Sequence, residues 1–99
     1  MNTTDKTPVS HNSYFDGMVQ SLGVNTVKGK ATVGIMKPGN YTFGTSAPEV
    51  MIVITGLLNV KLPGSDWKAY HPQETFSIAA NQSFEVSCTQ DVAYICYYG

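Results

Sequence analysis

Short runs of alternating apolar and polar residues, each ended by a turn signal, constrain the fold of this chain more than any other feature. Alternation places one face of a strand against a core and the other in solvent. Pro, Gly, Asn and Asp lie between the runs, and turns favour these residues. Strands are expected at residues 31–36, 41–45, 49–54, 57–62, 67–70, 75–78, 83–88 and 92–98, with the fourth as the hairpin partner of the third. So many strands in 99 residues predict an all-β jelly roll or an up-and-down barrel, and the order of the turns favours the jelly roll.

The composition fits one small globular domain and argues against several classes of partner. The chain is 42% hydrophobic and 13% charged, which indicates a dry core rather than disorder. Its net charge is −1, and its six basic residues are scattered lysines. A nucleic-acid duplex partner would need a basic stripe, so none is expected. No apolar run approaches the roughly 20 residues of a membrane helix, so no membrane is expected either.

The ends and the rarer residues give further expectations. Residues 1–12 are polar and predict a flexible arm, and residues 13–99 form the domain. The arm has no apolar stretch typical of a secretory signal, so a cytoplasmic location is the default. Cys88 and Cys96 lie in apolar segments and are expected to be buried, reduced thiols, with a disulfide as the less favoured alternative. His11 and His71 are expected to be exposed.

One segment near the middle of the chain has the spacing of a known barrel motif. It contains Gly39, then Phe43 and Thr45, then Glu49 and, after six further residues, Gly56. The pattern resembles the first cupin motif, G…HxH…E-x6-G, with Phe43 and Thr45 where the motif has its two histidines. This resemblance implies a cupin jelly-roll β-barrel. Zinc, iron and manganese sites usually need His, Cys or carboxylate ligands that converge on one point, so no metal is expected.

A wider set of positions, from residue 13 to residue 98, carries a second resemblance. The matching positions are Tyr14-Phe15-Asp16-Gly17, Gly34-Ile35-Met36, Tyr41-Thr42-Phe43, Pro48-Glu49, Gly56, Asn59-Val60, Leu62-Pro63, Trp67, Phe76, Ser83-Phe84 and Tyr94-x-Cys96-x-Tyr98. This pattern resembles the small cupin family of pyrimidine/purine nucleoside phosphorylases. The resemblance implies reversible phosphorolysis of purine and pyrimidine nucleosides to a free base and a pentose 1-phosphate. It also implies inorganic phosphate as co-substrate, no metal or other cofactor, and a homodimer.

Glu49 is the candidate catalytic group. Phosphorolysis of a glycosidic bond passes through an oxocarbenium-like state, which a nearby carboxylate stabilises. Strand alternation places Glu49 on the same face as Met51 and Val53, which predicts that it points inward. The alternative is a rim glutamate that faces water.

Several side chains are expected to contact the substrate. Tyr41, Phe43, Phe76 and Phe84 offer faces on which a base can stack, and Thr45 and Met51 complete the predicted lining. Every base has a π-face, so such a lining accepts purines and pyrimidines alike. The alternative is that these aromatic rings only fill the barrel.

Phosphate has no obvious binder, because the chain contains no arginine. Thr45 offers a hydroxyl and Lys30 offers a cation at the start of a strand, so both are predicted to hold phosphate. For Lys30, a solvated lysine at a sheet edge remains an equal alternative.

Two other functions remain open at the level of sequence. The first is a non-catalytic cupin that binds a small sugar or nucleotide. The second is a metal-dependent cupin that uses Glu49 together with His71. A homodimer would bury sheet edges or apolar surface of so short a chain, and the candidate surfaces are the Tyr14-Phe15 segment and the strand at residues 94–98.

Overall fold

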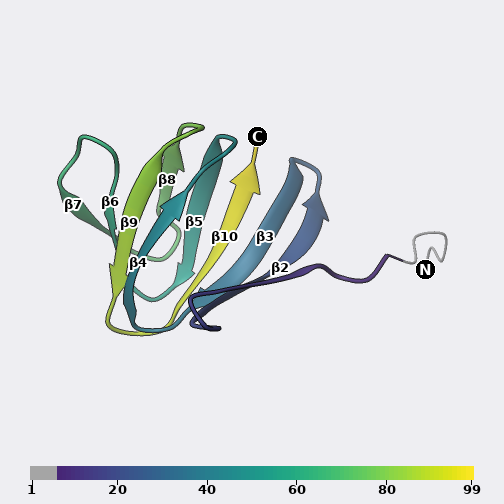
Figure 1. The fold of residues 1–99 in the computed structure, drawn as a ribbon, viewed down its shortest axis with the longest axis horizontal. Helices are drawn as coiled ribbons and strands as arrows, with labels where there is room; N and C mark the ends of the chain where they lie inside the picture. Colours follow the sequence, from purple (N-terminus) through teal and green to yellow (C-terminus); the bar gives the residue numbers. More distant parts are fainter. Residues whose placement is uncertain (1–6) are drawn as a thin grey trace.

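The structure, a computed structural model, describes residues 7–99, and these residues form ten strands in two facing sheets (Figure 1). The strands are β1 (His11–Tyr14), β2 (Val19–Thr26), β3 (Gly29–Met36), β4 (Gly39–Gly44), β5 (Glu49–Thr55), β6 (Leu58–Lys61), β7 (Trp67–Tyr70), β8 (Thr75–Ile78), β9 (Ser83–Cys88) and β10 (Val92–Tyr98). Residues 7–99 contain no helix, so no helix of this part of the chain could cross a membrane.

The strand order is that of a jelly roll. One sheet has six strands in the order β1-β2-β3-β10-β5-β8, and the other has four in the order β4-β9-β6-β7. All of the recorded pairings are antiparallel, and the chain crosses between the sheets several times. The prediction of an all-β jelly roll is confirmed. The two sheets lie face to face and do not close into one continuous ring.

The last four strands, β7 to β10, have the bounds that the turn signals predicted, whereas the N-terminal part differs. β1 begins at His11, two residues before the expected start of the domain, and the backbone oxygen of Ser10 already accepts a hydrogen bond from the Gly23 N–H (3.0 Å). The first six residues of the predicted arm lie outside the described residues. β1 and β2 are not among the predicted strands, although Asp16-Gly17 is a turn signal between them.

The predicted hairpin of β5 with β6 is wrong. β5 pairs with β10 and β8 in the six-stranded sheet, while β6 pairs with β7 and β9 in the other sheet. Gly56 lies between β5 and β6 with φ +89°, and a Cβ there would collide with the backbone oxygen of Asp91. The tight turn therefore passes under the start of β10 and carries the chain from one sheet to the other.

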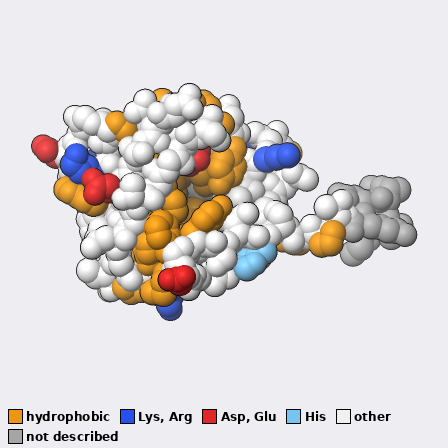
Figure 2. Space-filling view, viewed as in Figure 1, with side chains coloured by type: hydrophobic (Ala, Val, Ile, Leu, Met, Phe, Trp, Pro, Cys, Tyr) orange, Lys and Arg blue, Asp and Glu red, His pale blue; other side chains and the backbone are white. Residues whose placement is uncertain are grey.

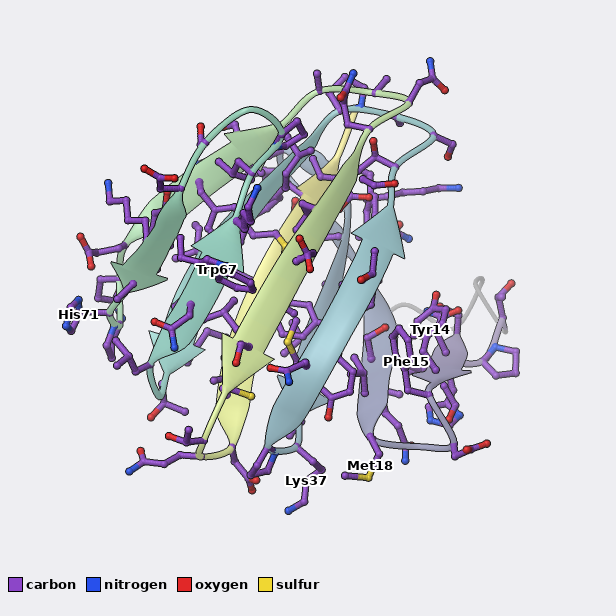
Figure 3. All side chains as sticks on the ribbon, turned by 60° about the vertical axis from the view of Figure 1, so that its left-hand side comes forward. Tyr14, Phe15, Met18, Lys37, Trp67 and His71 are labelled. Atoms are coloured by element: carbon purple, nitrogen blue, oxygen red, sulfur yellow. The ribbon has the colours of Figure 1, made fainter. Side chains whose placement is uncertain are left out.

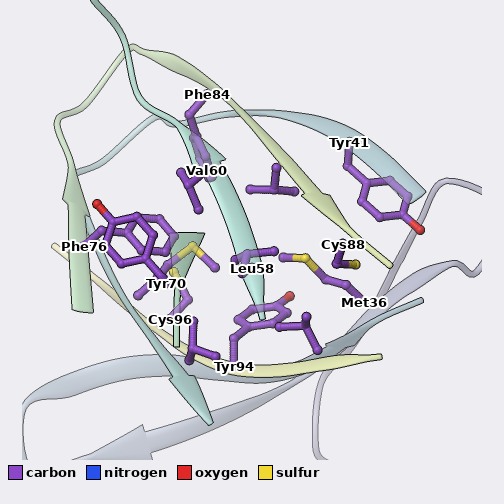
Figure 4. Packing of buried hydrophobic residues seen from close by; sticks show 14 of the residues in the cluster. Met36, Tyr41, Leu58, Val60, Tyr70, Phe76, Phe84, Cys88, Tyr94 and Cys96 are labelled. Carbon is purple, nitrogen blue, oxygen red and sulfur yellow. The ribbon is translucent and has the colours of Figure 1, made fainter. Parts of the chain in front are cut away.

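The core consists of the side chains that both sheets turn inward (Figure 4). Val19, Val53, Leu58, Val86 and Val92 are completely buried. Tyr70 and Phe76 pack with ring centroids 4.8 Å apart at the end near β7 and β8. Both cysteines are buried and free, as expected from their apolar surroundings.

Candidate functional site

A pocket of about 340 Å³ lies between the two sheets and opens beside the β1–β2 turn. The six-stranded sheet supplies a mostly polar wall, and the four-stranded sheet supplies an aromatic wall. Figure 2 shows hydrophobic side chains gathered in the middle of one face of the molecule, between the two halves of the sandwich. The volume is within the range of small-molecule sites.

Glu49 is the acidic group of the pocket. It is the first residue of β5, is half-buried, and lines the pocket together with Met51 from the same face of the strand. The Cys96 Sγ–H donates a hydrogen bond to Oε1 of Glu49 (3.4 Å). Burial raises the pKa of the Glu49 carboxyl above its ordinary value, and the bond from Cys96 offsets part of that shift. The carboxyl is thus a weakly hydrated group, whose interactions with a ligand are stronger than they would be in water.

The rest of the polar wall comes from one face of β10. Tyr94, Cys96 and Tyr98 alternate along that strand and all line the pocket. Burial raises the pKa of Tyr94 and that of Cys96 to about 12, so both groups stay protonated at neutral pH. The Tyr98 hydroxyl lies 2.9 Å from Oγ1 of Thr32, and burial raises its pKa as well. The wall therefore offers neutral hydroxyls beside one carboxyl.

Gly34 makes room for this wall. A Cβ at Gly34 would lie 2.6 Å from the Tyr94 ring and 2.8 Å from the backbone oxygen of Gln20. Only a residue without a side chain lets the Tyr94 ring lie against β3. A glycine inside a strand often marks such a close approach.

Phe43 and Phe84 form the aromatic wall. Their rings stack with centroids 5.8 Å apart and planes 30° apart. Across the mouth, the ring of Phe15 meets Phe43 edge-on at 5.4 Å, and Tyr14 does so at 6.5 Å. Tyr14 and Phe15 lie at the β1–β2 turn (Figure 3), where Phe15 has the left-handed φ of +53°. That uncommon backbone conformation aims the Phe15 ring at β4.

The structure brings four of the predicted site residues together: Glu49, Met51, Phe43 and Phe84 all line the pocket. Phe76 does not line the pocket, and its ring packs behind Phe84 with the two ring centroids 6.3 Å apart. Tyr41 packs against Phe15 at 5.0 Å but does not line this pocket. Its hydroxyl donates to the backbone oxygen of Lys37 (2.7 Å).

The two residues predicted to bind phosphate lie elsewhere. The Thr45 hydroxyl donates to the backbone oxygen of Ala79 (2.7 Å) and accepts from the Gln82 N–H (3.0 Å), so it braces the β8–β9 connection. Lys30 lies on β3 and lines a separate hollow of about 480 Å³. Tyr98 lines both that hollow and the inner pocket. Its side chain therefore separates Lys30 from the inner pocket that contains Glu49.

Sequence reasoning did not assign Tyr94, Cys96, Tyr98 or Ser21 to the site, nor Phe15. The first three could have been found, because alternation along residues 92–98 puts them on one face. Within residues 7–99, no three His, Cys, Asp or Glu side chains are placed to share a metal ion. His71 is exposed, and its Nδ1 lies 2.9 Å from Oε1 of Glu74 rather than near Glu49.

The jelly roll, with an inward-facing glutamate between its two sheets and an aromatic wall opposite, has a cupin-type fold with an internal pocket. A cupin-2 domain of Rhodospirillum rubrum has the same fold, with a TM-score of 0.72 at 13% identity over 97% of this chain and 73% of that one. That likeness supports the fold alone.

Closer comparisons identify the family. The family model described as pyrimidine/purine nucleoside phosphorylase matches residues 9–98. A protein of Magnetococcus marinus named pyrimidine/purine nucleoside phosphorylase is 51% identical over 89 residues, which cover 89% of this chain and 96% of that protein. A crystal structure of a Vibrio parahaemolyticus protein of unknown function superposes with a TM-score of 0.86 at 46% identity, over 91% of this chain and 97% of the other. This chain belongs to the pyrimidine/purine nucleoside phosphorylase family.

Proposed function

We propose that this protein is a pentosyltransferase that cleaves purine and pyrimidine nucleosides with inorganic phosphate, giving a free base and a pentose 1-phosphate. The observation that carries the proposal is the inner pocket, where the Glu49 carboxyl shares one cavity with the stacked rings of Phe43 and Phe84. Membership of the family supports the same reaction.

In the proposed reaction, a phosphate oxygen attacks C1′ of the sugar while the C–N glycosidic bond breaks. The base leaves with the bonding electron pair and takes up a proton. In the transition state the C–N bond is largely broken and the C–O bond to phosphate is only partly formed, so the sugar ring carries positive charge. A carboxylate held in advance beside the ring stabilises that charge. Glu49 has this role. The Cys96 thiol holds one of its oxygens, and the second oxygen is available to the sugar hydroxyls.

The base is proposed to lie against the aromatic wall. Phe43 and Phe84 give a stacked surface, and Phe15 can cover it from the mouth side. Stacking contributes about 1–3 kcal/mol per base and depends little on which base it is. Because apolar contacts discriminate weakly between ligands, this wall supports broad specificity.

For phosphate, we propose the side of the pocket that Tyr98 occupies. Lys30 lies beyond Tyr98 in the adjoining hollow, where it could supply the positive charge once the Tyr98 ring swings away. Thr45, the other predicted group, would have to give up its bond to the backbone of Ala79 before donating to phosphate. Replacing Lys30 with Met should therefore raise the KM for phosphate and leave the KM for the nucleoside unchanged.

The reaction is proposed to need no metal or other cofactor. The lack of a clustered ligand set among residues 7–99 supports this. Prior dialysis against a chelator should leave the rate unchanged, and a rate restored only by added zinc or manganese would contradict it. A cytoplasmic location is part of the same proposal, supported by the free thiols of Cys88 and Cys96, which persist in a reducing compartment.

The decisive experiment measures base release from uridine and from adenosine, with and without phosphate. We expect release only when phosphate is present, with pentose 1-phosphate formed in equal amount. Release that stays at the level without enzyme, in excess phosphate, would end the proposal.

One observation favours a second candidate, a cupin that binds a sugar or nucleotide without turnover. The described residues that line the inner pocket include no lysine. Saturable stabilisation by nucleosides in a thermal shift assay, without any product at any phosphate concentration, would identify that function instead.

We also propose that the protein is a homodimer, and the outer face of the six-stranded sheet supports it. Side chains there form two apolar rows across four strands, with Val24, Ala31, Tyr97 and Val50 in one and Leu22, Val33, Ile95 and Ile52 in the next. Neither row contains a charged residue, and the Nζ of Lys28 lies 5.7 Å from the centroid of the Tyr97 ring in the first row. Leu22 is 50% exposed and Ile35, just beside it, is 46% exposed. A contiguous apolar patch of this kind usually marks a protein interface.

This surface contains the outward side of β10, the strand that sequence reasoning selected. The other candidate, the Tyr14-Phe15 segment, packs instead against Phe43 at the mouth of the pocket. The dimer is thus proposed to form through the sheet face, and the mouth stays open to substrate.

A further inference from the structure

A second hollow, of about 460 Å³, lies on the outer face of the four-stranded sheet. It is separate from the inner pocket, and the two share Thr42 as a lining residue. Trp67 forms one side of it and is 48% exposed. Figure 3 shows the Trp67 side chain lying across this sheet on the side away from the core.

The sheet register sets polar side chains beside that indole in two rows. Thr42, Glu85, Lys61 and Trp67 are successive partners in the first row, and Asn40, Ser87, Asn59 and Ala69 are partners in the second. All eight project outward, because their neighbours Tyr41, Val60 and Val86 point into the core. The hollow therefore has one flat apolar side and a floor of amide, hydroxyl and carboxylate groups.

These polar groups are not used by the fold. Within residues 7–99, no hydrogen bond or ion pair involves the side chain of Asn40, Asn59, Glu85 or Ser87, nor the indole N–H of Trp67. Elsewhere on the surface, polar side chains such as Lys37 with Asp91 and His71 with Glu74 do pair. A large exposed indole beside unpaired donors and acceptors has no evident structural purpose.

We infer that this face is a second binding site, for a neutral sugar ring such as a unit of an oligosaccharide. The C–H face of a pyranose is slightly positive and fits against the negative face of an indole. Vicinal hydroxyls each donate and accept, which matches the paired N–H and C=O of Asn40 and Asn59 and the acceptors of Glu85. Glu85 lines the hollow, and Lys61, which does not line it, is its register partner on β6 and offsets its charge. The carboxylate disfavours an anion and the neighbouring lysine disfavours a cation, so the site favours an uncharged ligand.

This site is independent of the proposed reaction. A ligand here would stack on Trp67 in the open, whereas the inner pocket encloses its ligand between Glu49 and the phenylalanines. A nucleobase could also stack on an indole. The many hydroxyl-matching groups favour a sugar, and the experiment separates the two.

Trp67 is the one tryptophan of the chain, so its fluorescence reports directly on this face. We expect maltose, cellobiose or lactose to change the emission saturably, with a dissociation constant on the order of 1 mM for so open a site. Uridine and adenosine, as matched probes, should leave the emission unchanged. Emission that responds to nucleosides but to none of the sugars would overturn the assignment, as would emission that responds to neither.

Calorimetry with variants tests the geometry without the fluorophore. Trp67→Ala should weaken sugar binding about tenfold or more, Asn59→Ala should weaken it about threefold, and Trp67→Phe should retain most of it. Trp67 is exposed on an edge strand, so these variants should fold, and circular dichroism checks this. Glu49→Gln is the matched control, altered in the inner pocket, and should bind sugar normally. Equal binding by wild type and Trp67→Ala would overturn the proposal.

One further outcome also contradicts the site. If Trp67 emission depends on protein concentration without any ligand, a second copy of the chain covers this face, and the hollow is an interface.

Discussion

The two outer faces of this sandwich have opposite chemistry, although they arise from the same alternating strands. The outer face of the six-stranded sheet has two rows of apolar side chains without a charge. The outer face of the four-stranded sheet has amides, hydroxyls, a glutamate, a lysine and a single indole. The first is suited to contact with another apolar surface, as in the proposed dimer, and the second to contact with water or with the proposed sugar.

The difference can be traced to individual strands. β10 reads Val-Ala-Tyr-Ile-Cys-Tyr-Tyr, apolar or aromatic on both faces, which is typical of a strand covered on both sides. β9 reads Ser-Phe-Glu-Val-Ser-Cys, with polar residues at every outward position, which is typical of a strand with one solvated face. The outward residues of these two strands therefore agree with the proposed dimer, in which the six-stranded sheet is covered and the four-stranded sheet is not.

The largest expected effect concerns neither face and tests whether the chemistry lies between them. Glu49→Gln keeps the shape of the side chain but removes its charge, so kcat/KM for phosphorolysis should fall about 10²–10⁴-fold. Glu74→Gln, a surface carboxylate beside His71, is the matched control and should keep full activity. Full activity in Glu49→Gln would remove Glu49 from the reaction.

The second largest effect is expected on the outer face of the six-stranded sheet. Ile35→Lys places a charge in the apolar face, and a buried, unpaired charge is strongly disfavoured at an interface. In analytical ultracentrifugation, wild type should sediment as a dimer and Ile35→Lys as a folded monomer. Asn40→Lys, on the polar face, should remain dimeric. Monomeric wild-type protein at all concentrations would contradict the proposed dimer.

A smaller effect is expected at the wall that the two sheets enclose. Gly34→Ala would push a methyl group against the Tyr94 ring and the Gln20 backbone oxygen, at a cost of about 1–3 kcal/mol in the free energy of unfolding. Chemical denaturation measures this. Tyr94→Ala removes a buried ring and is destabilising by itself, so it serves as a second background. Adding Gly34→Ala to Tyr94→Ala should cost less than adding it to wild type, because the methyl then has room. An equal cost in the two backgrounds would show that the clash lies with the backbone.

The smallest effect is a pH-dependent difference in melting temperature. Burial raises the pKa of Glu49 in the folded protein, so the folded state favours the protonated form. This stabilisation is present below the unfolded pKa and is lost as pH rises through the folded pKa. Glu49→Gln cannot ionise, so its melting temperature should rise relative to that of wild type as the pH increases from about 4, the ordinary pKa of glutamate, through the raised pKa of the folded state. A constant difference across that range would contradict the raised pKa.

The same shift predicts the acid limb of the reaction. If the carboxylate form of Glu49 is required, activity should decrease with falling pH at a pKa above the ordinary value for glutamate. A limb at or below the ordinary value would mean that substrate binding reverses the shift.

The sequence by itself determined the strands with clear turn signals and the part of the site that lies on them. Pro63-Gly64 and Asn81-Gln82 bound β7, β8 and β9 without ambiguity. The motif spacing placed Glu49 on a strand and predicted that it points inward, because alternation is a local property of the backbone. Phe43 followed from the same motif, in which it stands at a histidine position.

Only the tertiary structure decided the contacts between segments far apart in the chain. The turn at Gly56 leads into the other sheet by passing close to the backbone oxygen of Asp91, where a side chain would collide. This contact joins residues 35 positions apart, so the local sequence pattern does not predict it. Thr45 is held by Ala79 and Gln82, more than thirty residues away, so its hydroxyl could not be assigned from its own neighbours. Phe15 reaches the pocket because its own backbone has a left-handed conformation in the β1–β2 turn. Alternation fixes which side of a strand a residue occupies, but the packing of the two sheets decides what that side meets.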